Sequence, residues 1–459
     1  MKLKSINPHD QSVIGELEIT TQDQVLETVA KAKAAFKTWR FSSISERVEC
    51  LKKYRQKISD HKEELAKLVS QEMGKPLHQS QEDITFELEF VDYYINEGPK
   101  ALEDKKVLDK GKEQYRTVYE PYGVCAVIAP WNFPVSMFNS GVLPALLAGN
   151  TVVFKPSEYS TLSQKMCADL LMESGFPDGV FNLIIGSKDV GRMLIDAPID
   201  LVWFTGSTKA GSEIYKKCGE KFVKAICEMG GSSAGIVFAD ADLEVTMENL
   251  YWARFLNCGQ VCSAVKRLFV EKSVFDVVLQ RFTDRLKDVK VGNPLEDVDF
   301  GPLVFPEQVT KLEEVIADAV SRRAKIVIGG KRLTGKEYAK GNYFEPTILT
   351  NITPDMRVMS EEVFGPVLPV VSFETEDQVV EMANNTEYGL TSEVYTTDLK
   401  KGERIAKRLD SGVVAINTDN YFKPSCPFGG CKKSGMGREY GEIGIQEFAQ
   451  VKLIAVNQP

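Results

Sequence analysis

The chain contains two series of short apolar runs, each the length of a β-strand and separated by segments with helical periodicity. The first series consists of GVCAVIAP, GNTVVFKPS, VFNLIIG and DLVWFTGS, and the second of AGIVFADAD, RLFVEKS, AKIVIGG and VLPVVSF. Apolar strands that alternate with helices form βαβ units, whose parallel sheet is covered on both faces. The sequence therefore predicts an α/β fold with two parallel-sheet domains.

Length, charge and cysteine content limit the classes of function. The chain has 459 residues and a net charge of −9, which argues against a nucleic-acid or anionic-membrane surface because both need a basic face. No apolar run reaches the length of a membrane span, and MKLKSINPHD does not resemble a signal peptide. Since the nine cysteines are scattered and odd in number, we expect reduced thiols and a cytoplasmic protein.

The segments outside the two series carry simpler patterns. Residues 22–75 combine helical periodicity with paired charges, and residues 81–104 predict a further helix. The last segment, EFAQVKLIAVNQP, alternates like a strand. This strand either pairs with another subunit or forms an edge of its own domain.

Two cysteines lie four residues apart in NCGQVC (257–262), in a chain with three histidines. A free cysteine is most often an inert, buried thiol, whereas a thiolate is a strong nucleophile. The stretch by itself leaves both interpretations open for Cys262.

Three more stretches bear on that choice: PWNFP (130–134), FTGSTKAG (204–211) and CEMGG (227–231). Together with NCGQVC, EEVFGPV (361–367) and PFGGCKKSGMGRE (427–439), their order resembles the aldehyde dehydrogenase superfamily from about residue 7 to the end. The resemblance implies an enzyme that oxidises an aldehyde to a carboxylic acid with NAD or NADP. It also implies that family's fold of two Rossmann-like domains and a small β oligomerisation arm.

The resemblance assigns catalytic roles to three residues. Cys262 matches the thiol that attacks the aldehyde, forming a thiohemiacetal and then a thioester. Glu228 matches the general base that activates water against the thioester, and Asn132 matches an amide donor to the oxyanion. Cys258 is expected to pack in the core. A zinc site built from Cys258, Cys262, Cys426 and Cys431 is not expected, because Cys262 belongs to the catalytic motif.

Cofactor residues also follow from the resemblance, because the usual GxGxxG fingerprint is absent. The expected cofactor-binding residues are Trp131, Lys155, Glu158, Gly206, Ser207, Glu362 and Phe364. Ser207 precedes a helix whose N-terminus can hold a pyrophosphate, and Glu362 matches the residue that binds the nicotinamide ribose. Glu158 matches a ribose-binding position where a carboxylate repels a 2′-phosphate, which favours NAD over NADP.

The substrate is less constrained. The chain is similar to short bacterial succinate-semialdehyde dehydrogenases, which bind the substrate carboxylate with two arginines; Ser140 and Leu256 stand at those positions here. Lys423 or Arg254 could replace them, or both could be surface charges. We therefore expect succinate semialdehyde or a similar short aldehyde, with an uncharged or hydroxylated aldehyde as the alternative. A CoA-acylating enzyme and a non-catalytic family member are further alternatives, but the presence of Glu228, Cys262 and Asn132 disfavours them.

The family's architecture predicts the domain limits. Residues 1–102 and 122–231 would form the NAD-binding domain, and residues 232–446 the catalytic domain. Residues 103–121 and 447–459 would form the oligomerisation arm of a homodimer or homotetramer.

Overall fold

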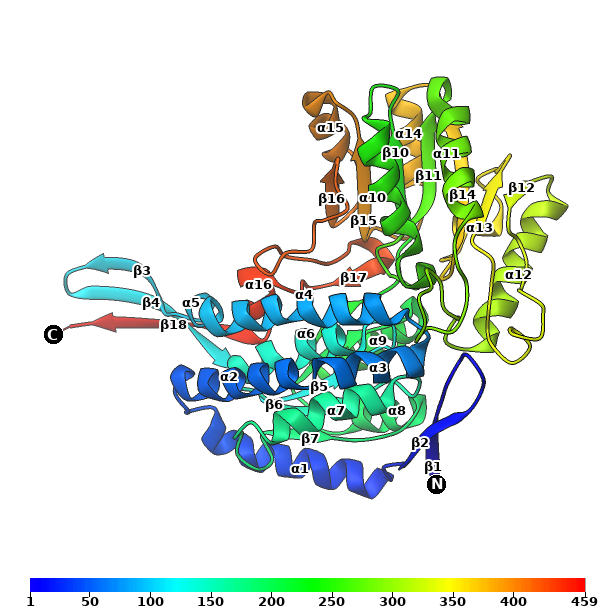
Figure 1. Ribbon diagram of the computed structural model, residues 1–459. Helices are drawn as coiled ribbons and strands as arrows, with labels where there is room; N and C mark the ends of the chain where they lie inside the picture. Colours follow the sequence, from blue (N-terminus) through cyan, green and yellow to red (C-terminus); the bar gives the residue numbers. More distant parts are fainter. Residues whose placement is uncertain (459) are drawn as a thin grey trace.

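The computed structural model describes residues 1–458 and contains two sheet-centred bodies, drawn one above the other in Figure 1, with a narrow sheet that projects from one side. The lower sheet has six strands. Their order is β17 (Gly435–Met436), β9 (Lys224–Glu228), β8 (Leu201–Thr205), β5 (Val124–Ile128), β6 (Thr151–Lys155) and β7 (Phe181–Leu183). β5 to β9 are parallel, and β17 pairs antiparallel with β9.

Successive residues of β5 contribute to two different cores, as expected for a strand buried on both faces. Val124 and Ala126 face one core, and Cys125 and Val127 face the other. The first face is covered by α1 (Gln22–Trp39), α8 (Lys188–Asp196) and α9 (Thr208–Lys221). The second is covered by α2 (Ile44–Asp60), α3 (Lys62–Met73), α4 (Leu77–Asn96), α6 (Pro134–Leu147) and α7 (Thr161–Met172).

The helices expected over residues 22–75 are α1, α2 and α3, and the region 81–104 holds the end of α4 and the short α5 (Gly98–Ala101). Thr21 and Ser43 begin α1 and α2 with capping boxes, in which each side chain accepts from a backbone N–H of the first turn.

The upper sheet has seven strands. Their order is β12 (Lys325–Ile328), β13 (Thr347–Thr350), β14 (Val367–Phe373), β11 (Val265–Glu271), β10 (Ser233–Val237), β15 (Thr391–Tyr395) and β16 (Val413–Ile416). One strand departs from the expected parallel series: β12 pairs antiparallel with β13. No helix connects these two strands, and a parallel pair needs such a crossover.

Six helices belong to the upper body. They are α10 (Leu243–Phe255), α11 (Phe275–Lys287), α12 (Pro306–Ser321), α13 (Arg357–Ser360), α14 (Glu376–Asn384) and α15 (Leu399–Ala406). Short 3₁₀ turns cover Leu256–Gly259 (η1), Lys272–Val274 (η2) and Lys432–Ser434 (η3). The chain begins with a hairpin of β1 (Lys2–Ile6) and β2 (Val13–Glu18). A short helix, α16 (Gly441–Gln446), lies near the C-terminus. Within residues 1–458, no helix combines the length and apolar character that a membrane crossing requires.

The projecting sheet consists of β3 (Lys105–Lys110), β4 (Glu113–Pro121) and β18 (Ala449–Asn457), in the order β18-β4-β3 (Figure 1). The alternating C-terminal segment thus forms a strand, and it pairs antiparallel with β4 of its own chain along its whole length. Its other edge has no partner strand among the described residues.

Candidate active site

The quoted stretches follow neighbouring parallel strands of the lower sheet. PWNFP follows β5, FKPSE overlaps the end of β6, FTGS includes the end of β8, and Glu228 is the last residue of β9. Ligands of open parallel sheets bind at the carboxyl ends of the strands. From Glu228 the chain crosses directly into the upper sheet, where β10 begins at Ser233.

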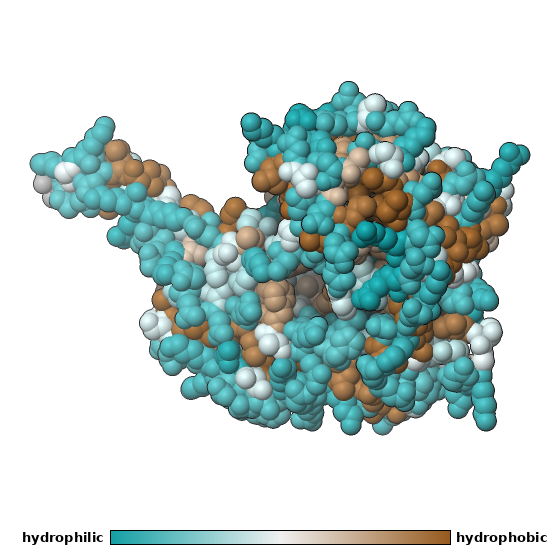
Figure 2. All heavy atoms as spheres, turned by 45° about the horizontal axis from the view of Figure 1, so that its top comes forward, coloured by the Kyte–Doolittle hydropathy of each residue, from teal (hydrophilic) through white to brown (hydrophobic). Residues whose placement is uncertain are grey.

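A cavity of about 600 Å³ lies where the two bodies meet, and the surface between them is hollowed (Figure 2). Its lining includes eight of the ten predicted site residues, which are Asn132, Trp131, Gly206, Ser207, Glu228, Cys262, Glu362 and Phe364. Lys155 and Glu158 do not line it. Lys155 is buried at the end of β6, where its ammonium donates to the carbonyls of Pro156 and Gly186 at 2.6 and 2.9 Å and lies 3.9 Å from the Glu158 carboxylate.

An unusual backbone conformation presents Cys262. Asn257, Cys258 and Gly259 in η1 all have φ values between 51 and 71°, in the left-handed region. The Asn257 side-chain amide donates to the carbonyl of Asn132 at 3.0 Å, and the Asn132 amide donates to the carbonyl of Gln260 at 3.1 Å. These reciprocal bonds hold the predicted oxyanion donor against the loop that carries the thiol.

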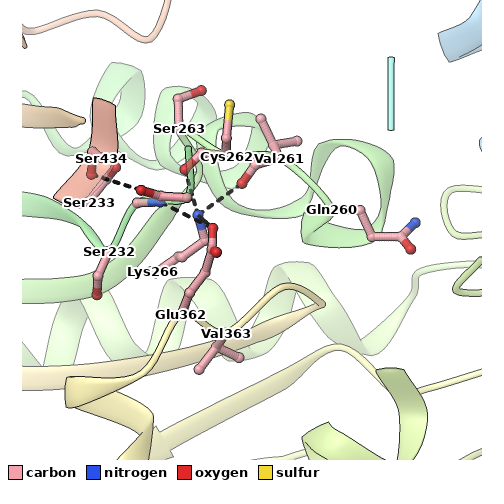
Figure 3. A network of polar contacts seen from close by, with 12 residues as sticks. Ser232, Ser233, Gln260, Val261, Cys262, Ser263, Lys266, Glu362, Val363 and Ser434 are labelled. Carbon is pink, nitrogen blue, oxygen red and sulfur yellow. Dashed lines mark hydrogen bonds and ion pairs between the residues drawn. The ribbon is translucent and has the colours of Figure 1, made fainter. Parts of the chain in front are cut away.

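Cys262 is partly exposed and points away from Lys266, whose ammonium lies on the other side of the loop (Figure 3). Lys266 donates to the carbonyls of Val261 and Cys262 at 3.0 and 2.6 Å and lies 3.3 Å from the Glu362 carboxylate. Burial raises the pKa of the Cys262 thiol to about 12, while the charge of Lys266 acts in the opposite direction. The resting thiol is therefore protonated at neutral pH. Sequence reasoning missed Lys266, which lies four residues after Cys262.

Glu228 is 3% exposed, and neither of its carboxyl oxygens has a hydrogen-bond partner within the described residues. Burial and the neighbouring Glu439 carboxyl raise its pKa well above the usual range. Burial raises the pKa of Glu439 itself to about 8, although Thr205 donates to it at 3.3 Å. The sequence analysis quoted Glu439 at the end of PFGGCKKSGMGRE without giving it a role. Two buried carboxyls that share a site are suited to hold and release protons near neutral pH.

Glu362, Phe364 and Trp131 line another part of the cavity. Glu362 accepts a hydrogen bond from the Gly231 N–H at 3.1 Å. Its carboxylate lies so close to Gly230 that a Cβ there would come within 2.0 Å of it. Phe364 packs edge-on against Trp131 at 5.6 Å between ring centroids. Ser207 caps α9 by accepting from the Ala210 N–H at 3.3 Å, so the positive end of that helix faces the cavity.

The two cations considered for a substrate carboxylate do not line the cavity. Arg254 is fully buried, and its guanidinium donates to the carbonyls of Val363 and Gly365. Lys423 is exposed. Leu256 and Ser140 stand at the two positions where succinate-semialdehyde dehydrogenases carry arginines. Leu256 lines the cavity. Ser140 is buried, and its hydroxyl donates to the Ser136 carbonyl at 2.9 Å.

The remaining cysteines are dispersed. Cys258 is buried in the upper core, where its thiol donates to the Gly301 carbonyl at 3.3 Å. No group of three or more His, Cys, Asp or Glu side chains within residues 1–458 is arranged to hold a metal ion.

Comparisons with known proteins agree with this geometry. The model of the aldehyde dehydrogenase family matches residues 1–454. The betaine aldehyde dehydrogenase of Bacillus subtilis (strain 168) is 38% identical over 457 residues, which are 98% of this chain and 93% of the relative. The NADP(+) succinate-semialdehyde dehydrogenase GabD of Escherichia coli (strain K12) is 34% identical over 453 residues, which are 98% of this chain and 93% of the relative.

Among solved structures, betaine aldehyde dehydrogenase from Staphylococcus aureus in complex with NAD+ superimposes with a TM-score of 0.96 at 34% identity. The match covers 100% of this chain and 92% of that one. The family, the fold class and the enzyme class predicted from the six stretches are confirmed. The chain belongs to the aldehyde dehydrogenase family.

Proposed function

We propose that the protein oxidises a short aldehyde to the carboxylic acid with NAD and water, using Cys262 as nucleophile. The observation that carries the proposal is the convergence of Cys262, Glu228 and Asn132 on one cavity from three separate segments. A thiol, a carboxyl without hydrogen-bond partners and an amide donor are the groups that acyl transfer through a thioester requires.

In the first step the Cys262 thiol releases its proton to solvent and its sulfur bonds to the aldehyde carbon, which gives a thiohemiacetal. Loss of a hydride from that carbon then converts the thiohemiacetal into a thioester. The Asn132 amide and the Cys262 backbone N–H donate to the oxygen, which becomes an oxyanion; one such donor typically contributes about 3–4 kcal/mol to the transition state. Glu228, whose pKa is raised, accepts a proton from water. The resulting hydroxide attacks the thioester carbon, the C–S bond breaks, and the acid is released.

The lower sheet supports a dinucleotide site. Ser207 and the N-terminus of α9 would hold the pyrophosphate, Lys155 and Glu158 the adenosine ribose, and Glu362 with Phe364 and Trp131 the nicotinamide ribose. A nicotinamide cofactor bound there would supply the acceptor for the hydride that leaves the carbon attached to Cys262. The Glu158 carboxylate would repel a 2′-phosphate, which supports NAD over NADP.

The proposal includes a homodimer or homotetramer formed through the projecting sheet, because β18 has an unpaired edge and exposed apolar side chains. It also includes a cytoplasmic location, since all nine cysteines are free thiols. The domain limits given above remain part of the same proposal.

Replacing the nucleophile tests the reaction directly. We expect Cys262→Ala to remove aldehyde-dependent NADH formation, measured at 340 nm, while NAD binding measured by calorimetry is retained. Cys258→Ala is the matched control. Because that thiol lies in the upper core, we expect the variant to keep most of the activity. Turnover by the Cys262 variant at the wild-type rate would contradict the assignment.

A further inference from the structure

In addition to the predicted catalytic residues, the cavity is lined by a continuous row of aromatic rings. This aromatic wall consists of Phe86, Phe90, Tyr440, Phe428, Phe422 and Tyr421, and every member lines the cavity. Successive ring centroids along the row are 5.1, 4.7, 6.5, 4.6 and 5.1 Å apart. Ring faces attract cations through their quadrupole, an effect that strengthens when the site excludes water.

Carboxyl groups lie beside both ends of the aromatic wall. Eight acidic side chains line the cavity: Glu82, Asp83, Glu87, Glu228, Glu362, Glu393, Asp419 and Glu439. Within residues 1–458, Lys75 is the single basic side chain in the lining. It is already paired, with its ammonium 3.0 Å from the Asp83 carboxylate and 3.7 Å from the centre of the Phe133 ring. Among the described residues, the lining therefore offers no unpaired cation to a substrate carboxylate, and its acidic side chains far outnumber its basic ones.

Across residues 1–458, Glu393 has one carboxyl oxygen without a hydrogen-bond partner, whereas both oxygens of Glu87 accept hydrogen bonds. It lies on β15 and is 1% exposed. Its Oε2 accepts from the Tyr395 hydroxyl at 2.6 Å, but its Oε1 has no hydrogen-bond partner in the described part of the chain. Glu87, at the other end, accepts from Ser136 and Asn139 at 2.6 and 3.2 Å. A buried carboxyl oxygen without a donor is unfavourable unless a ligand supplies one.

Glu393 is also held in a fixed relation to the nucleophile. Thr391, two residues earlier on the same face of β15, donates to the carbonyl of Ser263 at 3.0 Å, and Ser263 follows Cys262. Two residues along a strand, such as Thr391 and Glu393, are separated by roughly 7 Å. A separation of this size suits an aldehyde whose charged group lies a few carbons from its carbonyl. Tyr421 bridges the two groups: after burial, Glu393 is the largest cause of its raised pKa, and Cys262 also contributes.

We propose that the substrate is a short aldehyde that carries a positive charge, with the cationic group bound by Glu393, Asp419 and the Tyr421–Phe422 end of the aromatic wall. This inference rests on the proposed function and specifies its substrate class. A protonated amine donates to the free oxygen of Glu393 and lies against the rings. Burial raises the pKa of Glu393 to about 8, and a bound cation lowers it again because it stabilises the carboxylate.

Pairs of aldehydes with the same shape and different charge test the substrate class. 3-Aminopropanal and butanal differ by an ammonium in place of a methyl group, and betaine aldehyde and 3,3-dimethylbutanal differ by nitrogen in place of carbon. Succinate semialdehyde serves as the anionic substrate. We expect kcat/KM for 3-aminopropanal to exceed that for butanal by about 30-fold or more, and succinate semialdehyde to be the poorest substrate.

Betaine aldehyde and 3,3-dimethylbutanal form the quaternary pair, in which the cation cannot donate a hydrogen bond. This pair therefore separates a hydrogen bond to Glu393 from attraction through the rings and the charge. A preference for 3-aminopropanal over butanal without a preference for betaine aldehyde over 3,3-dimethylbutanal supports a hydrogen-bonded ammonium at Glu393. Equal preferences in both pairs support binding through the rings and the charge alone. Both results support a cationic substrate.

Variants test the residues. Glu393→Gln keeps the shape and an acceptor for Tyr395 but removes the charge, and we expect it to reduce the ratio of kcat/KM for 3-aminopropanal over butanal by about tenfold. Asp419→Asn, at a partly exposed position, is the second variant and reduces the same ratio. Asp377→Asn is the control, because this exposed carboxylate pairs with Arg408 outside the cavity and its loss leaves the ratio unchanged.

The results separate this inference from the proposed function. Oxidation of butanal or succinate semialdehyde as efficiently as 3-aminopropanal would overturn the cationic substrate and leave the dehydrogenase intact. An unchanged ratio in folded Glu393→Gln and Asp419→Asn would overturn the assigned site. Failure of the wild-type protein to oxidise any of the five aldehydes would overturn the proposed function and the inference with it.

Discussion

Glu228 combines two properties that favour a general base. Its carboxyl oxygens have no hydrogen-bond partners among residues 1–458, so they are free to accept from water. Its pKa is raised, so it accepts a proton near neutral pH. Glu439 contributes to the raised pKa through repulsion between the two buried carboxyls. Because a base acts only in its ionised form, hydrolysis of the thioester should accelerate as the pH rises through the pKa of Glu228.

Glu228→Gln should therefore separate the two halves of the reaction. We expect a full pre-steady-state burst of NADH in stopped-flow absorbance, followed by steady-state turnover that is slower by about 100-fold. The acceleration with pH should disappear from the slow phase. Loss of the burst would instead indicate that Glu228 acts earlier, in removing the proton from Cys262.

The charge of Lys266 has the largest lowering effect on the pKa of Cys262. We expect Lys266→Met to raise that pKa further, so that less thiolate is present at any pH below it. Inactivation by iodoacetamide, followed against pH, should be slower by roughly tenfold, and its profile should shift to higher pH. Lys266→Arg keeps the charge and should restore the profile. A Met variant with the wild-type profile would show that Lys266 only supports the loop.

At the scale of elements, the turn η1 determines where Cys262 lies. Gly259 adopts a φ of 71°, and a Cβ at this position would come within 2.5 Å of the Gly365 carbonyl oxygen. Both the conformation and the close approach require glycine. The turn thus joins the nucleophile to the Glu362–Gly365 segment of the upper body.

Gly259→Ala should destabilise this element. We expect a loss of about 1–3 kcal/mol from the backbone conformation alone, seen as a lower Tm, together with a lower kcat because Cys262 moves away from Asn132. Gly219→Ala is the control, since no atom lies within 4 Å of a Cβ there. Its position inside α9 predicts a gain of about 0.5–1 kcal/mol. Equal Tm values for the two variants would contradict the explanation.

At the scale of the whole molecule, the projecting sheet leaves many side chains exposed outside the two sheet-centred bodies. All six residues of β3 are exposed, and Val451 and Leu453 on one face of β18 are 63% and 59% exposed. Apolar side chains on a sheet with an open edge favour association with another copy of the chain.

Val451→Asp combined with Leu453→Asp should therefore shift the protein from an oligomer to a monomer, measured by light scattering after size-exclusion chromatography. Val277→Asp, at a comparably apolar exposed position on α11, should leave the mass unchanged. A wild-type protein that is itself monomeric would refute the proposed role of the sheet.

The sequence alone determined the local features. The strand and helix periods depend on neighbouring residues, so they predicted the α/β class, the helices before residue 75 and the C-terminal strand. The order of the motifs predicted Cys262, Glu228 and Asn132, which line one cavity. β12 was the exception, because its antiparallel direction depends on the absence of a crossover helix.

Only the tertiary structure decided which charges share the cavity. Glu393 and Asp419 come from β15 and from the loop after β16, Glu82 and Glu87 come from α4, and no sequence spacing relates them. The same holds for Arg254, which binds carbonyls in the core rather than a substrate. Electrostatic interactions and desolvation depend on distance in space, so the substrate preference is set where distant segments of the chain meet.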